Sequence, residues 1–140
     1  MLNELTENSI TLLKQLISIP SLSREENHTA DAIDVFLKAH GVETRRKLNN
    51  VWARNRSFDP SKPTILLNSH HDTVKPNSAY TVDPFSPEII DGKLYGLGSN
   101  DAGGCLVSLI ATFLHFNERQ DLAYNLCLAP CCETAVGGGD

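Results

Sequence analysis

The sequence predicts an α/β fold, an α/β/α sandwich with a mixed, largely parallel sheet, and three observations support this prediction. Apolar residues recur at helical spacing in three segments of the chain. Two short apolar runs without alternation, at 64–69 and 122–128, are typical of strands that are buried on both faces of a sheet. Helical and strand segments alternate, as they do when helices flank a partly parallel sheet.

Two helices are predicted near the N-terminus. An apolar stripe recurs along residues 5–19 and indicates an amphipathic helix, which ends at a proline. Ser23 and Glu26 fit a capping box at the start of a second helix over 24–40. Gly41 is a suitable residue to end this helix, because glycine tolerates the left-handed conformation found there.

The remaining elements follow from turn signals and apolar patterns. Residues 42–56 suit a hairpin that turns at Asn49 and Asn50. The next strand, at 64–69, is apolar enough to be predicted as a central strand of the sheet. A loop rich in proline, serine and aspartate covers 76–91, and a third helix is predicted through about residue 116.

Composition excludes several classes of protein. The 140 residues carry a net charge of -5, and no window collects the basic residues that nucleic acid or an anionic membrane would attract. The N-terminus lacks the pattern of a signal peptide, and no apolar run approaches the roughly 18–20 residues of a membrane span. A cytoplasmic protein is therefore predicted. In that reducing compartment the four cysteines are not expected to form disulfides.

The first segment that could carry chemistry is SHHDTV, directly after the strand at 64–69. Strand ends are where α/β proteins place ligand sites. If the two-residue period continues, His70 and Asp72 point to one side and His71 to the other. A histidine can bind zinc through one ring nitrogen while a carboxylate accepts a hydrogen bond from the other. An isolated HxD more often begins an ordinary polar loop.

The second segment is PFSPEIIDGKLYGLGSNDAGG, a glycine-rich loop that ends where the third helix begins. Its glycines allow close backbone approach, so the loop can bring Asp101 to a metal held by the neighbouring strand. Asn100 or Asp101 could equally serve as a helix N-cap, and the two roles are compatible. The spacing does not fit a phosphate-binding loop.

In this order, about 30 residues apart, the two segments resemble the zinc-dependent family that contains acetylornithine deacetylase, succinyl-diaminopimelate desuccinylase and aminoacylase. The resemblance extends over essentially the whole chain. It implies that residues 1–140 are the N-terminal part of a catalytic domain with a two-zinc exopeptidase-like fold. The dimerisation or lid domain and the C-terminal half would then be absent.

The resemblance also implies roles for individual residues. His70 would bind one zinc, Asp72 would orient it, and Asp101 would bridge two zinc ions, for which cobalt could substitute. The expected reaction is hydrolysis of an N-acyl amino acid of the acetylornithine type, or of a short peptide, in amino-acid biosynthesis. A glutamate would take a proton from the attacking water.

The tail departs from the family pattern, which has a run of acidic residues ending in two adjacent glutamates, a general base and a metal ligand. Here the stretch is LAPCCETAVGGGD, and only Glu133 is acidic before the final residue. Either Thr134 and Ala135 occupy the base and ligand positions, or Glu133 is the base and Thr134 replaces the ligand. An incomplete, inactive hydrolase is therefore expected. The alternative is a truncated, non-catalytic remnant, such as a frameshift product, with weak metal binding or self-association only.

Overall fold

A computed structural model describes residues 2–22 and 25–132 of the chain. The helices and strands, in chain order, are α1 (Leu2–Ser18), α2 (Asn27–Ala39), β1 (Thr44–Lys47), β2 (Asn50–Arg54), β3 (Thr64–His70), β4 (Glu88–Ile90), β5 (Lys93–Tyr95), the short turn η1 (Ser99–Gly103), α3 (Gly104–Phe116) and β6 (Asn125–Cys131).

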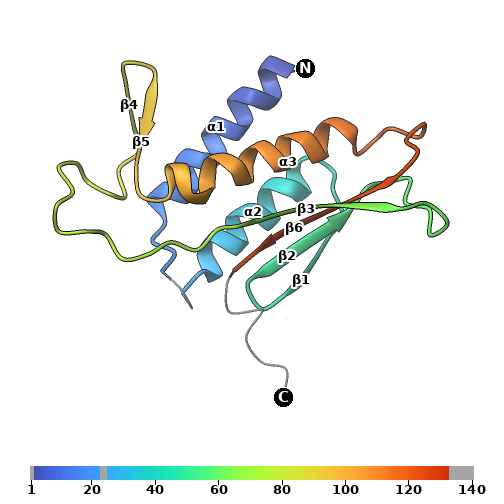
Figure 1. Ribbon diagram of the computed structural model, residues 1–140, viewed down its shortest axis with the longest axis horizontal. Coiled ribbons are helices and arrows are strands. Elements are labelled where there is room, and N and C mark those ends of the chain that lie inside the picture. The colour runs from blue at the N-terminus through green and yellow to red at the C-terminus, as the bar shows by residue number, and fades with distance from the viewer. Residues whose placement is uncertain (1, 23–24, 133–140) are drawn as a thin grey trace.

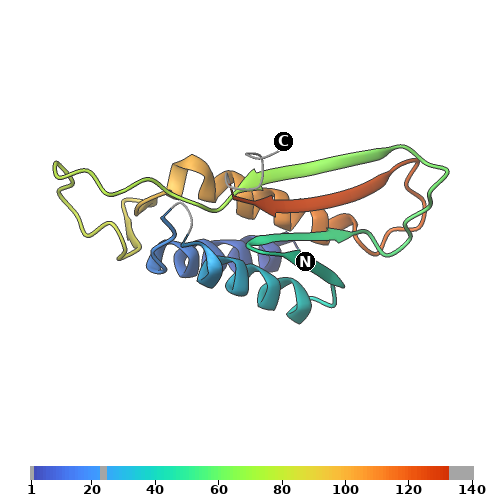
Figure 2. The ribbon, with the colours of Figure 1, turned by 90° about the horizontal axis from the view of Figure 1, so that it is seen from below.

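Four strands form a mixed sheet in the order β1-β2-β6-β3, and β4 and β5 form a separate hairpin (Figure 1). The β3–β6 pairing is parallel, whereas β1–β2 and β2–β6 are antiparallel. Figure 2 shows β3 and β6 side by side, with α1 and α2 below them. The α/β class and the mixed sheet are confirmed, although the parallel part is limited to one of the three pairings described.

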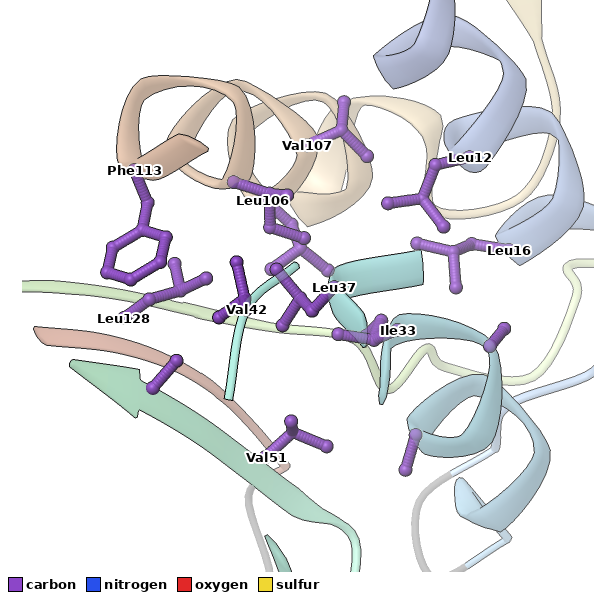
Figure 3. Packing of buried hydrophobic residues seen from close by; sticks show 14 of the residues in the cluster. Leu12, Leu16, Ile33, Leu37, Val42, Val51, Leu106, Val107, Phe113 and Leu128 are labelled. Atoms are coloured by element: carbon purple, nitrogen blue, oxygen red, sulfur yellow. The ribbon is translucent and has the colours of Figure 1, made fainter. Parts of the chain in front are cut away.

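All three helices contribute to one hydrophobic core with β2 and β6 (Figure 3). The apolar stripes predicted for the helices are buried, including Leu12, Ile33 and Ile110. Alternation along β6 places Leu126 and Leu128 in this core. Because one core unites the three helices, they cover the same face of the sheet, and a second helical layer stays a prediction.

The prediction that 64–69 is a central strand buried on both faces is wrong. β3 is an edge strand in the part of the chain that the structure describes, and β6 holds the central position beside it. Leu66 has 58% of its surface exposed. An apolar run predicts a strand whose two faces can be buried. It does not reveal whether the helices and strands that would bury it belong to the same stretch of sequence.

The start of the second helix also differs from the prediction. α2 begins at Asn27, and Glu26 is its N-cap residue without a side-chain capping bond, so Glu26 does not complete a capping box. Ser23, the other half of that box, lies outside the described residues. The end of the helix is as predicted, since Gly41 follows it with a φ of 73°.

The predicted β1–β2 hairpin is confirmed with a small shift, since it turns at Leu48 and Asn49, one residue earlier than expected. The predicted loop at 76–91 differs at its end, where β4 (Glu88–Ile90) pairs with β5. Asp91 and Gly92 connect these two strands, and both have positive φ, as in a type I′ hairpin turn. In the described ranges, no helix combines the length and apolar character needed to cross a membrane.

Candidate metal centre

The first motif lies at the carboxyl end of β3, where the strand leaves the sheet. His70 is the last residue of β3 and is paired with Cys131 in the parallel register. Directly after the strand, the amide of His71 donates to the carbonyl of Cys131 over 3.1 Å. The amide of Thr73 then donates to the carbonyl of Ser21 over 2.8 Å. These bonds fix the path of the chain through the motif.

The second motif brings a carboxylate to the His70 ring. The Nε2 atom of His70 lies 3.3 Å from an Oδ atom of Asp101. This separation is long for a hydrogen bond. It does equal the spacing of about 3.3 Å between two ligand atoms that bind a tetrahedral zinc ion at roughly 2.0–2.1 Å. The pair is therefore spaced to hold one ion between them.

The other ring nitrogen of His70 faces Asp72. Nδ1 lies 3.2 Å from the backbone oxygen of Asp72 and 3.3 Å from its Oδ1 atom. Only 8% of the Asp72 side chain is exposed, and Oδ1 is buried without a hydrogen-bond partner. A proton on Nδ1 would be stabilised by both oxygens, which leaves Nε2 unprotonated and available to a metal.

The loop before α3 holds Asp101 at the rim of the site. Asp101 itself is extended (φ −124°, ψ 94°) within η1, and 90% of its side chain is exposed. Gly98 precedes η1 with a φ of 75°, a conformation that costs other residues about 1–2 kcal/mol. A Cβ atom on Gly98 would lie 2.6 Å from Cγ2 of Thr73, so glycine permits the loop to approach the first motif.

Gly98→Ala is expected to destabilise the chain more than Gly41→Ala, which is a matched control. Both glycines have nearly the same positive φ, but a Cβ atom on Gly41 meets no atom within 4 Å. We expect Gly41→Ala to cost about 1 kcal/mol of unfolding free energy, and Gly98→Ala about 1–3 kcal/mol more because of overpacking. Urea denaturation measures both values. Equal losses would show that the loop moves away from Thr73 without cost.

A cavity of about 640 Å³ opens beside the three motif side chains. Its walls include His70, Asp72 and Asp101, together with Lys75 and Tyr80 from the loop that follows β3. This volume falls in the range of small-molecule sites. Lys75 and Tyr80 were not singled out from the sequence, because nothing in their local pattern separates them from other polar loop residues.

His71 points away from this cavity and is buried, with 6% of its surface exposed. Its Nε2 atom lies 2.9 Å from the carbonyl oxygen of Asn49, and its Nδ1 atom lies 2.8 Å from the hydroxyl oxygen of Thr29. Burial lowers the pKa of His71, against smaller opposing effects from the Asn49 carbonyl and the carboxylates of Glu26 and Asp72. The ring is therefore neutral near pH 7.

The structure thus brings together His70, Asp72 and Asp101, as the two motifs predicted. Glu133, the predicted base, lies outside the described residues, as do Thr134 and Ala135. Within residues 2–22 and 25–132, no cluster of three or more histidine, cysteine or acidic side chains is placed to hold a metal. Two donor atoms fit the geometry of zinc, whereas zinc sites use three or four ligands in total from the protein.

Comparison with known proteins shows where similar sequences occur. The model of peptidase family M20/M25/M40 matches residues 66–138. A "probable carboxypeptidase" of Emericella nidulans is 37% identical over 136 residues, which cover 92% of this chain and 31% of that protein. A succinyl-diaminopimelate desuccinylase of Beijerinckia indica is 29% identical over 127 residues, covering 83% of this chain and 32% of its own length. The chain therefore spans about a third of these relatives.

Among solved structures, a metallo-carboxypeptidase of Sulfolobus solfataricus has a similar fold. The TM-score is 0.74 at 22% identity, and the alignment covers 89% of this chain and 30% of the other. At this level of identity the similarity concerns the fold. It supports the arrangement of helices and mixed sheet described above.

Proposed function

The chain belongs to peptidase family M20/M25/M40, in agreement with the family resemblance of its two motifs, and we propose that it contributes the first part of a metal-dependent amidohydrolase catalytic domain. In this proposal residues 1–140 supply one side of a two-metal site. By the family resemblance, the remaining ligands and a dimerisation or lid domain would be supplied by sequence other than residues 1–140.

The observation that carries the proposal is the 3.3 Å spacing between Nε2 of His70 and the carboxylate of Asp101. The two residues come from different elements, 31 positions apart, and the Asp101 side chain is 90% exposed, so its own burial does not explain its position against the histidine ring. The buried, unpartnered Oδ1 atom of Asp72 behind the ring adds a second observation. Together they support a histidine that is oriented for metal binding.

Each residue has a distinct role in the proposed site. His70 and Asp101 would hold the metal, with Asp101 shared between two ions, and Asp72 would keep the proton on Nδ1 of His70. Zinc, when bound, supplies a Lewis acid that polarises the amide carbonyl of the substrate. Glu133 would take a proton from the attacking water in one of the two possible alignments of the tail.

The proposed substrate is an N-acyl amino acid or a short peptide. The curated relatives named above are a desuccinylase and a carboxypeptidase, and both names describe cleavage of an amide beside an amino acid. The cavity of about 640 Å³ is large enough for such a molecule. An acetylornithine-type substrate, a role in amino-acid biosynthesis and a cytoplasmic location extend this proposal on the resemblance alone.

Zinc titration by calorimetry tests the proposed metal site. The isolated chain is expected to bind zinc weakly, because the described residues offer two ligands, and His70→Ala should weaken this binding at least about tenfold. His28→Ala is the control, since His28 is an exposed histidine on α2. Equal affinities of the wild type and the His70→Ala variant would contradict the proposed site.

We also propose that the isolated chain does not hydrolyse N-acetylornithine. Only Glu133 represents the acidic run of the family, so either the metal ligand or both the base and the ligand are missing. The alternative function, a remnant limited to weak metal binding or self-association, predicts the same inactivity. Turnover that is abolished by His70→Ala would contradict both views and show a complete site.

A further inference from the structure

We propose that His71 is a positioning residue that locks the metal-binding segment of the site to α2 and to the β1–β2 turn. This inference rests on the proposed function, because the position it fixes is that of the two neighbours, His70 and Asp72. His71 itself faces away from the cavity, so its role is to hold the segment and not to contact a substrate.

The hydrogen bonds of the ring define its tautomer. The carbonyl oxygen of Asn49, 2.9 Å from Nε2, can only accept, so Nε2 of His71 carries the proton. In the neutral ring Nδ1 is then an acceptor. The Thr29 hydroxyl has a single proton and lies 2.8 Å from Nδ1 and 3.0 Å from the carbonyl oxygen of Glu26, so Nδ1, the nearer acceptor, competes with that carbonyl for the proton. Both ring nitrogens thus face groups 22 and 42 residues distant in the sequence.

The partners of His71 also contact one another or their neighbours, in a network that is buried at α2 and half-buried at Asn49. The side-chain amide of Asn49 lies 3.3 Å from a carboxylate oxygen of Glu26 and donates to it. Glu26 and Thr29 are both buried, and the Thr29 hydroxyl lies 3.0 Å from the carbonyl oxygen of Glu26. These contacts connect the end of β3, the start of α2 and the β1–β2 turn, and the guanidinium of Arg46 borders them at the surface, 3.5 Å from the side-chain oxygen of Asn49.

The opposite facing of neighbouring side chains transmits this anchoring to the site. His70 and Asp72 line the cavity, whereas His71 between them faces Thr29 and Asn49. A fixed His71 therefore keeps its two neighbours oriented toward the cavity. The backbone hydrogen bonds donated by His71 and Thr73 fix the distance of the segment from its neighbours Cys131 and Ser21. The two hydrogen bonds of the His71 ring resist rotation of the segment about its own long axis. A metal ligand that is misoriented by even a small rotation loses affinity.

Two substitutions remove the anchor in different ways. His71→Phe keeps a planar ring but removes both hydrogen bonds, and Thr29→Val keeps the shape of the threonine but removes the hydroxyl. Thr29→Ser keeps the hydroxyl and should behave like the wild type. Phe113→Leu is the matched control, because it perturbs a fully buried core residue of α3 that does not take part in this network.

The first measurement is made on the metal-free chain. The nitrogen-15 chemical shifts of the His70 ring report the contact of Nδ1 with Asp72. We expect these shifts to change in His71→Phe and Thr29→Val and to stay at wild-type values in Thr29→Ser and Phe113→Leu. Unchanged His70 shifts in both anchor variants would overturn the proposal, whatever their stability.

The second measurement is the zinc dissociation constant, taken well below the unfolding temperature of every variant. His71→Phe is expected to weaken zinc binding about tenfold, and Phe113→Leu to leave it within about twofold. If His71→Phe and Phe113→Leu weaken zinc binding equally, His71 contributes only to general stability and the positioning role is wrong. If zinc binding by the wild type does not respond to His70→Ala, the proposed function fails, while the nitrogen-15 measurement still decides whether His71 positions the segment.

Discussion

Replacing Phe113 by alanine is expected to lower the free energy of unfolding by about 3–5 kcal/mol. Phe113 is fully buried on α3 and is among the largest side chains of the core (Figure 3). Alanine would leave a cavity between the helix and the sheet that the neighbouring side chains cannot fill. Since whole domains are stable by about 5–15 kcal/mol, a large fraction of the variant could unfold. Urea denaturation followed by circular dichroism measures the change.

Leu48→Ala is the control for this prediction. Leu48 is also a large apolar residue, but it lies in the β1–β2 turn with 79% of its surface exposed. Its replacement should change the stability by no more than about 0.5 kcal/mol. A loss below about 1 kcal/mol for Phe113→Ala would mean that the core around α3 is not packed as described.

The helices were predictable because their apolar stripes are local. Leu12, Ile33 and Ile110 are buried in the structure, and each was part of a pattern that spans fewer than 20 residues. The position of β3 was not predictable in this way. An apolar run such as 64–69 indicates a strand whose faces can be buried. Whether this strand lies at the edge or the centre of the sheet depends on which other strands are present.

The residues of the candidate site also differ in whether local sequence could predict their positions. The two-residue period of a strand predicted that His70 and Asp72 point to the same side. The glycine-rich loop in front of Asp101 indicated that this residue could approach them. The role proposed for His71 depends on Thr29 and Asn49, which are far away in sequence and meet it only in the folded chain. No spacing rule could have paired them.

We expect the largest gain in metal affinity from a single substitution in the tail. The family pattern implies an adjacent base and ligand, both glutamates, after the strand that corresponds to β6. If Glu133 matches the first acid of the run, the ligand position is Ala135. If the alignment shifts by one residue, Glu133 is the base and the ligand position is Thr134.

Ala135→Glu and Thr134→Glu separate these two alignments. A third protein ligand should tighten zinc binding on the order of a hundredfold in the variant that supplies it, because a carboxylate would then join the two proposed ligands, His70 and Asp101. The other variant adds a negative charge that is not a metal ligand and should improve binding by no more than a few fold. Calorimetry on the two variants and the wild type gives the comparison. Combining the successful variant with His70→Ala should cancel the gain, since the new ligand would no longer share an ion with the histidine. If neither glutamate tightens binding, the tail does not approach the carboxyl end of β3, and a family-like metal site cannot be rebuilt in this chain.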